Sequence, residues 1–219
     1  SSEHTISCST AGGVLSAIDR DRFDVIPVGI TRDGAFTLQP DDSARFTMNP
    51  EAMPEVHDNG TRVLWPDSAT SRELRVVDVD GSIRSLGEID VAFPILHGPW
   101  GEDGTIQGLL DMLDVPYVGA GVLGAAVCMD KDVCKRLLRD AGIAVTPFIT
   151  LTRRNAARTS FATAVSALGL PMFVKPANQG SSVGVSKVAN EAEYHAAVEL
   201  ALGFDEKVLV ESAVQGREI

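Results

Sequence analysis

A lysine and a glycine-serine loop stand together in residues 173–188, FVKPANQGSSVGVSKV. Lys175 closes an apolar run, and the proline after it marks the point where a strand is expected to end. Residues 180–184 read GSSVG, so successive backbone N–H groups can converge on an anion while the hydroxyls add donors. With the positive charge of Lys175, this combination suits a phosphate group.

Two plainer interpretations of the same stretch stay open. A lone lysine at a strand end can extend its ammonium into solvent. The GSSVG segment can equally be a flexible hairpin turn. It is not the common P-loop, because no GxxxxGK(S/T) string occurs and the loop leads into a strand pattern rather than a helix.

A second group of polar and glycine residues lies in 96–108, LHGPWGEDGTIQG. His97 stands at the carboxyl end of an apolar run, which is where open α/β sheets bind ligands, and the glycines let the backbone approach a small substrate. As alternatives, His97 can be a hydrogen-bonded loop histidine, and Glu102 and Asp103 can be a capping or solvated pair.

The elements that must position these residues alternate between helix and strand patterns, which is typical of an α/β fold. A nearly all-apolar run at 90–97 is expected to be a buried parallel strand, and 40–71 an irregular surface excursion. A domain boundary is expected near 119–121. Helices are expected at 5–18, 104–115, 129–142, 160–169 and 190–203, and strands at 23–31, 34–40, 90–97, 116–119, 145–151, 173–188 (a hairpin) and 207–214.

Composition narrows the classes of partner. The chain has 19 basic and 30 acidic residues, a formal charge of −11, which disfavours general affinity for nucleic acid or anionic membranes. No apolar stretch approaches a membrane span, and the first residues lack the pattern of a signal peptide, so a cytoplasmic location is expected.

The three cysteines, Cys8, Cys128 and Cys134, are expected to be reduced thiols without an assigned role.

Both ends of the sequence indicate part of a longer protein. The chain opens on Ser1 rather than Met and enters helix-like sequence at once, so an upstream strand is expected to be missing. It stops at VESAVQGREI, where a strand pattern resumes.

Four strings, taken in order, resemble the D-alanine:D-alanine ligases of the ATP-grasp superfamily. They are SSEHTISCSTAG, HGPWGEDGTIQGLLDMLDVPYVGAGVLGAAVCMDK, FVKPANQGSSVGVSKV and VLVESAVQGREI. The resemblance implies an amino-terminal parallel-sheet, Rossmann-like domain followed by the smaller α+β lobe of an ATP-grasp fold. It also implies ATP- and Mg²⁺-dependent joining of two D-alanines through an acylphosphate for peptidoglycan synthesis, by a cytoplasmic homodimer.

The resemblance also implies roles for individual residues. Lys131 and Lys175 are expected to contact the ATP phosphates, under a loop that includes Gly180, Ser181, Ser182 and Val183. On the adenosine side, the residues expected to bind are Glu211 (adenine amino group), the backbone of Ala213 and Val214 (adenine edge) and Glu218 (ribose). For catalysis, the residues expected are Glu3 (ammonium of the first D-alanine), His97 beside it and Ser181, which helps to lock the lid.

The same resemblance implies a division into a substrate-binding domain (1–119), a central lobe with the phosphate loop (120–210) and the start of a further lobe (211–219). The magnesium ligands, a transition-state arginine and the lid are expected beyond Ile219, so this chain alone is expected to be inactive. Two alternatives remain: a D-alanine:D-lactate ligase, and a non-catalytic module that binds nucleotide or D-alanine.

Overall fold

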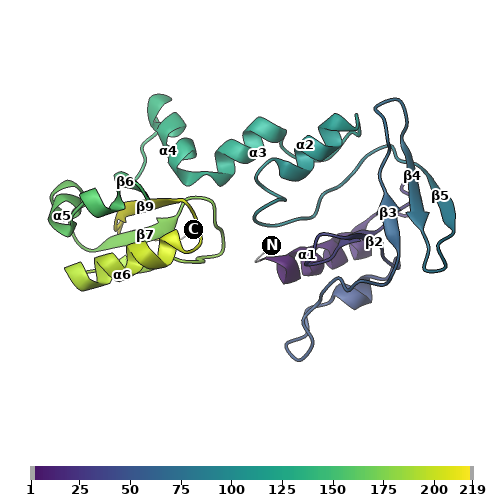
Figure 1. Ribbon diagram of the computed structural model, residues 1–219, viewed down its shortest axis with the longest axis horizontal. Coiled ribbons are helices and arrows are strands. Elements are labelled where there is room, and N and C mark those ends of the chain that lie inside the picture. The colour runs from purple at the N-terminus through teal and green to yellow at the C-terminus, as the bar shows by residue number, and fades with distance from the viewer. Residues whose placement is uncertain (1–2, 218–219) are drawn as a thin grey trace. The chain divides into compact units, whose positions relative to one another are not determined.

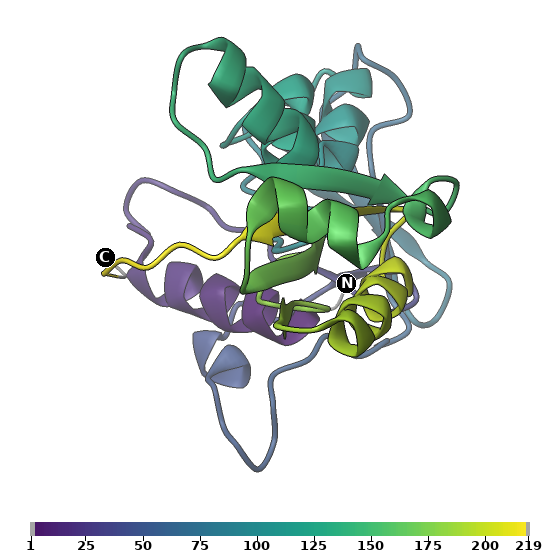
Figure 2. The same cartoon turned by 90° about the vertical axis from the view of Figure 1, so that its left-hand side faces the viewer.

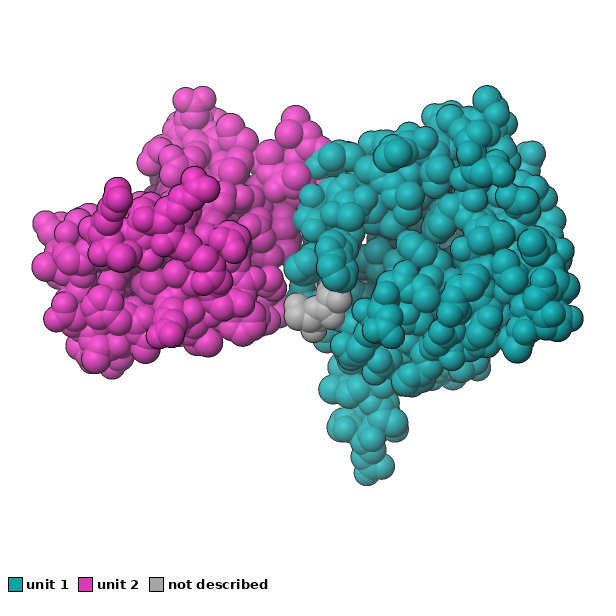
Figure 3. Space-filling model, in the orientation of Figure 1, with its two compact units in different colours: residues 1–122 teal, residues 123–219 magenta. Residues whose placement is uncertain are grey.

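The computed structural model describes residues 3–217, and the chain divides into two compact units, residues 1–122 (unit 1) and 123–219 (unit 2) (Figure 3). Each unit has its own hydrophobic core. The mixed α/β class is confirmed. The division of roles among 1–119, 120–210 and 211–219 stays a prediction.

Unit 1 combines helices with two small antiparallel sheets (Figure 1). One sheet pairs β1 with β2, and the other has the order β3-β4-β5. The elements are α1 (His4–Ala17), β1 (Val28–Ile30), β2 (Phe36–Leu38), the 3-10 helix η1 (Ser43–Phe46), β3 (Arg62–Leu64), β4 (Glu73–Val77), β5 (Ile83–Glu88) and α2 (Thr105–Met112).

The structure corrects three predictions for unit 1. The segment 40–71 is not wholly irregular, since it contains η1 and β3. The predicted parallel strand at 90–97 forms only one isolated parallel bridge, Ala92 to Tyr117, which is also the extent of the predicted strand at 116–119. The described strands of unit 1 pair antiparallel.

The physical reason lies in an apolar cavity of about 670 Å³. Residues 91–96 line it together with 25–30 and one face of α1. Much of the run faces this space, although Ala92 and Leu96 also pack against the core of Ile106, Leu110 and Val115, and Phe93 remains 53% exposed. An apolar run predicts a strand buried between sheet neighbours, whereas much of this run lines a cavity wall.

Unit 2 is built on a four-stranded antiparallel sheet with the order β6-β9-β7-β8. The hairpin predicted at 173–188 is confirmed as β7 paired with β8. The elements are α3 (Val122–Met129), α4 (Lys131–Asp140), β6 (Phe148–Thr152), the 3-10 helix η2 (Ala156–Arg158), α5 (Phe161–Leu168), β7 (Met172–Pro176), β8 (Ser186–Val188), α6 (Glu191–Leu202) and β9 (Lys207–Ser212).

Strand alternation divides this sheet into an apolar face and a charged face. Met172 and Val174 of β7 and Val208 and Val210 of β9 are fully buried in the core that α5 and α6 complete (Figure 2). Because successive side chains point to opposite faces, Lys175 and Glu211 must point to the other face. The fold thus places two charged side chains beside each other on a rigid support.

Candidate functional site

On the charged face of unit 2, Glu211 is the centre of a group of lysines. In the register of β9, Glu211 lies opposite Phe173 of β7, so Lys175, two residues along the same face, is its diagonal neighbour. The Lys175 ammonium lies 2.6 Å from Oε2 of Glu211. The interpretation of Lys175 as a lone lysine extending into solvent is therefore wrong.

The second lysine on Glu211 comes from α4. Lys135 places its ammonium 2.5 Å from Oε1 of Glu211 and 4.8 Å from the centre of the Phe148 ring, which lies opposite Glu211 in β6. The Glu211 side chain is only 9% exposed. A buried carboxylate needs paired charge, and two lysines supply it here.

The start of α4 is fixed to the sheet by a network of carboxylates. Asp130 caps the helix by accepting from the backbone N–H groups of Asp132 and Val133, and it also binds the ammonium of Lys207 in β9. Burial acts to lower the pKa of Lys207, but the hydrogen bond and charge of Asp130 outweigh it and raise that pKa. This anchor sets where the lysines of α4 meet the sheet.

Lys131, at the first position of α4, reaches the base of the glycine-serine loop. Its ammonium donates to the carbonyl oxygens of Ala177 at 3.2 Å and Gln179 at 2.5 Å. Burial, and secondly the charge of Lys175, lower the pKa of Lys131. The ammonium groups of Lys131 and Lys175 therefore lie close enough to destabilise each other's charge. An anion bound beside them would relieve this repulsion.

The loop between β7 and β8 is anchored at its base and turns tightly at its tip. Asp205 accepts from both the backbone N–H and the side-chain amide of Asn178. At the tip, Ser181 and Ser182 have positive φ values of 48° and 59°, and Val183 N–H donates to the carbonyl of Gly180. Two left-handed residues in succession, closed by this hydrogen bond, have the arrangement of a primed β-turn over residues 180–183.

The residues beyond β9 that the sequence predicts to bind adenosine are less enclosed. Ala213 donates its backbone N–H to the carbonyl of Pro171, and the Val214 side chain is 70% exposed. Glu218 lies outside the described residues.

In unit 1, α1 holds the His97 segment. The backbone N–H of His97 donates to Oγ of Ser7, and Nε2 of His97 lies 3.1 Å from Oγ1 of Thr10. Ser7 in turn donates its hydroxyl to the carbonyl of Glu3, the residue before α1. The start of α1 and the His97 loop are thereby brought together, as the predicted pairing of Glu3 with His97 requires.

The loop after His97 is shaped by its own carboxylates. Glu102 accepts from Gly98 N–H at 2.8 Å, while Asp103 accepts from Trp100 N–H and, as a cap of α2, from Thr105 N–H. Burial acts to raise the pKa of Asp103, but these backbone hydrogen bonds outweigh it and lower that pKa. The capping interpretation therefore fits Asp103 only, since Glu102 binds a backbone N–H of the loop and its side chain is 51% exposed.

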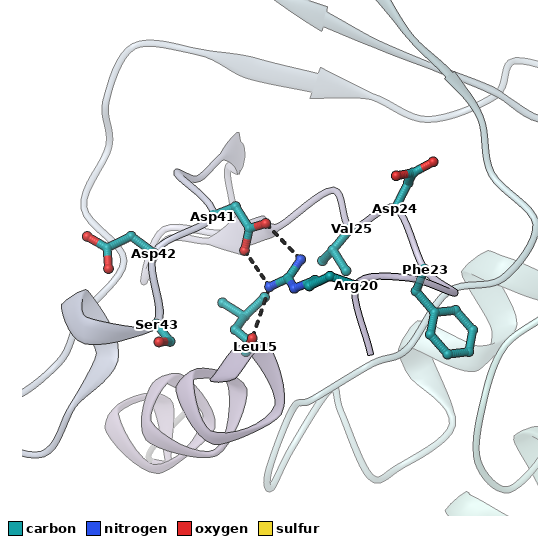
Figure 4. A pocket seen from close by; sticks show the side chains of 8 residues that line it. All are labelled: Leu15, Arg20, Phe23, Asp24, Val25, Asp41, Asp42 and Ser43. Carbon is teal, nitrogen blue, oxygen red and sulfur yellow. Dashed lines mark hydrogen bonds and ion pairs between the residues drawn. The ribbon is translucent and has the colours of Figure 1, made fainter. Parts of the chain in front are cut away.

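A separate pocket of unit 1, about 620 Å³, contains none of the predicted residues (Figure 4). Its cation, Arg20, donates to both carboxylate oxygens of Asp41 and to the carbonyl of Leu15. The guanidinium is thus already engaged within the pocket.

The predicted residues fall into one group in each unit. Unit 1 contains Glu3 and His97, and unit 2 contains the lysines, Glu211 and the loop with Ser181. Sequence reasoning missed Lys135, although its spacing of four residues from Lys131 in a predicted helix places both on one face.

Chemically, unit 2 combines cations, a turn rich in backbone donors and a buried acceptor, which together can bind an anion attached to an amine-bearing group. Within residues 3–217, no group of three or more histidine, cysteine, aspartate or glutamate side chains is arranged to hold a metal ion. None of the helices in this described part is long and apolar enough to span a membrane.

Comparison with known proteins places both units in one family. The model for the D-ala D-ala ligase N-terminus matches residues 1–120, and the model for the D-ala D-ala ligase C-terminus matches residues 137–219. All of the chain aligns with D-alanine--D-alanine ligase A of Chromobacterium violaceum at 49% identity and of Escherichia coli K12 at 47%. The chain spans 59% of the length of each of these relatives.

Solved structures of the same family also resemble this chain. The chain superposes on the D-Ala:D-Ser ligase from Enterococcus faecalis with a TM-score of 0.82 and 32% identity, covering 99% of this chain and 60% of that one. For the D-alanine-D-alanine ligase from Coxiella burnetii the TM-score is 0.81 and the identity 30%, covering 99% of this chain and 62% of that one. The chain belongs to the D-alanine–D-alanine ligase family, and its two units are portions of the amino-terminal domain and of the ATP-grasp fold.

Proposed function

We propose that this chain carries the phosphate-binding and first-substrate-binding parts of an enzyme that joins two D-alanines at the expense of ATP, for peptidoglycan synthesis. The observation that carries the proposal is the convergence of Lys131, Lys175 and Glu211 on the base of a glycine-serine loop. Family membership supplies the reaction to which this chemistry belongs.

The reaction explains the need for cations. A carboxylate is a poor acyl donor, so an oxygen of the first D-alanine attacks the γ-phosphorus of ATP, and ADP departs as the bond to its oxygen breaks. The amine of the second D-alanine then attacks the acylphosphate carbonyl, loses a proton and expels phosphate. Charge on the transferring oxygens must be neutralised throughout, and Lys131 and Lys175 are proposed to do so. The loop residues Gly180, Ser181, Ser182 and Val183 are proposed to close over the phosphates, with the Val183 N–H already used by the Gly180 carbonyl.

The same site has the groups that an adenosine needs. Each carboxylate oxygen of Glu211 is paired with one lysine ammonium. A carboxylate can accept about four hydrogen bonds, so Glu211 can still accept one from the adenine amino group. The backbone of Ala213 and Val214 is proposed to face the adenine edge. Glu218 is proposed to bind the ribose hydroxyls.

For the first D-alanine, Glu3 is proposed to accept from the ammonium, with His97 near the carboxylate end. Ser181 is proposed to help hold the lid closed. Mg²⁺ is proposed to accompany ATP, with ligands outside the described residues. We also propose the segment roles 1–119, 120–210 and 211–219, a cytoplasmic location and a homodimer, all on the strength of the family.

The second amino acid is the least constrained part of the proposal. One structural neighbour is a D-Ala:D-Ser ligase, which is a specific reason to test D-serine as an alternative second substrate. D-lactate is the other alternative, since a hydroxyl can replace the amine as nucleophile.

The test is ATP-dependent phosphate release by the complete protein, with D-alanine alone and with D-alanine plus D-serine or D-lactate. We expect release with D-alanine alone, together with D-alanyl-D-alanine as the product in mass spectrometry. Release that requires D-serine or D-lactate would replace the proposed substrate. Absence of release with every pair, despite ATP binding, would favour a non-catalytic module.

A further inference from the structure

Lys135 is the member of the lysine group to which the proposed chemistry gives no role. It is the less exposed of the two lysines on Glu211, at 15% against 26% for Lys175. It also arrives from a different element, α4, whereas Lys175 lies on the neighbouring strand. The Glu211 carboxylate is therefore held from two directions.

The two lysines have different freedom to remain on Glu211. Under the proposed function Lys175 must also serve the ATP phosphates, so its ammonium is shared. Lys135 is fixed by a second contact, because its ammonium lies 4.8 Å from the centre of the Phe148 ring. Phe148 itself is set directly opposite Glu211 by the β6–β9 register. Lys135 is thus the cation that can stay with Glu211 when nucleotide binds.

We propose that Lys135 is a positioning residue for Glu211, which it holds in the orientation that reads the exocyclic amine of the purine. This inference rests on the proposed function, which assigns Glu211 to adenine. A carboxylate accepts from the adenine amine, but it meets the carbonyl oxygen of guanine as another acceptor. A fixed carboxylate therefore sets both the affinity for adenine and the preference for ATP over GTP.

The experiment is equilibrium binding of ATP, adenosine and GTP to the complete protein by titration calorimetry. For Lys135→Met, we expect affinity to fall about tenfold for ATP and by the same factor for adenosine, the size of one lost charged hydrogen bond. The ATP-to-GTP preference should fall as well. Lys135→Arg should restore most of the affinity, because it restores a cation on Glu211.

Arg139→Met is the matched control. Arg139 lies on the same helix, one turn further along, and its guanidinium carbon is 5.9 Å from the centre of the same Phe148 ring, but it is exposed and its charge is not paired with Glu211. We expect ATP affinity to stay within about twofold of wild type. If the Lys135→Met variant is too unstable to titrate, the same titrations are made with Lys135→Gln.

Two results would overturn the inference while leaving the proposed function intact. If ATP binding weakens but adenosine binding does not, Lys135 contacts phosphates and does not act through Glu211. If the melting temperature falls but all three affinities are unchanged, Lys135 only supports the fold. By contrast, a wild-type protein that binds no ATP would remove the proposed function itself, and this inference with it.

Discussion

The two glycine-containing loops that carry predicted site residues are fixed in different ways. In unit 1 the loop after His97 is held from within, by the Glu102 and Asp103 carboxylates that accept from backbone N–H groups of the loop itself. In unit 2 the base of the loop after Lys175 is held from outside, where Asp205 accepts from Asn178 and Lys131 donates to two carbonyls, and its tip is closed by the hydrogen bond from Val183 N–H to the Gly180 carbonyl.

This difference suits the two kinds of ligand that we propose for the loops. A loop that satisfies its own backbone groups has a defined shape before a ligand arrives, which suits a small substrate that is recognised at a few points. In the second loop the outside anchors from Asp205 and Lys131 lie at the base, and the tip is a tight turn of left-handed serines, which we propose receives the phosphates. The first loop presents side chains and the second presents backbone with cations behind it.

The largest expected effect tests the cationic loop. Lys175→Met keeps most of the apolar stem but removes the charge, so we expect a loss of about 2–4 kcal/mol of transition-state stabilisation, roughly 30- to 1000-fold in kcat/KM. Because Lys135 still pairs with Glu211, the melting temperature should fall little. The measurements are ATP-dependent phosphate release and thermal melting of the complete protein. Normal turnover with a lower melting temperature would make Lys175 a purely structural partner of Glu211.

A smaller effect is expected from the substrate side. Glu3→Gln keeps the size of the side chain but removes the counter-charge of an ammonium, so the KM for the first D-alanine should rise by roughly 10- to 100-fold, as for a lost charged hydrogen bond. The KM for ATP should stay near the wild-type value. Steady-state kinetics with each substrate varied separately make the measurement, and unchanged D-alanine kinetics would limit Glu3 to the start of α1.

Packing of the unit 1 loop gives the third prediction. A Cβ on Gly101 would lie 2.4 Å from both Cβ and the carbonyl oxygen of Leu96, so Gly101→Ala should destabilise unit 1 by about 1–3 kcal/mol. Gly108→Ala is the control, because its Cβ would make only an ordinary contact with Val122 at 3.9 Å inside α2. We expect that control to stabilise slightly.

Urea unfolding followed by tryptophan fluorescence measures this pair. Trp65 and Trp100 both lie in unit 1, so the signal reports on that unit. Equal midpoints for the two alanine variants would show that the loop adjusts around residue 101.

The smallest effect concerns pH. His4 is buried and its Nε2 accepts from Val56 N–H; burial, followed by the charge of Arg32, lowers the His4 pKa below 6.5. Between the folded pKa and 6.5, the unfolded chain binds more protons than the folded one, so stability should rise with pH through this window. Lower pH therefore weakens unit 1.

His4→Gln should flatten that dependence, as measured by urea midpoints across the window. The control is His195→Gln, whose side chain is 66% exposed in unit 2. A wild-type midpoint that falls as pH rises through the window would reverse the assigned sign.

The hairpin and its flanking helices were predictable because their signals are local. The strand, loop and strand of 173–188 and the helix that begins at Lys131 follow from alternation, glycine and capping within short windows. The pairing of Lys175 with Glu211 was not predictable in this way, because the register of β7 on β9 sets it across a long stretch of sequence. Lys135 and Glu211 are likewise 76 residues apart.

The errors have a physical reason as well. In β5, most side chains are exposed, so no alternation of apolar residues reveals a strand in the stretch after the 40–71 segment. At 90–97 the apolar signal was strong but ambiguous, since a cavity wall and a buried strand have the same composition. Sequence pattern reports burial from water more directly than it reports hydrogen-bond partners.

The strand order of unit 2 has a consequence for synthesis. β9 is the last strand of the described chain, but it lies between β6 and β7, which make no pairing with each other. While the chain emerges from the ribosome, β6 therefore has no described sheet partner until residues 207–212 have been made. The apolar side chains of β7 can meanwhile pack against α5 and α6, which precede β9 in the chain, but the sheet itself closes only when β9 joins β6 to β7.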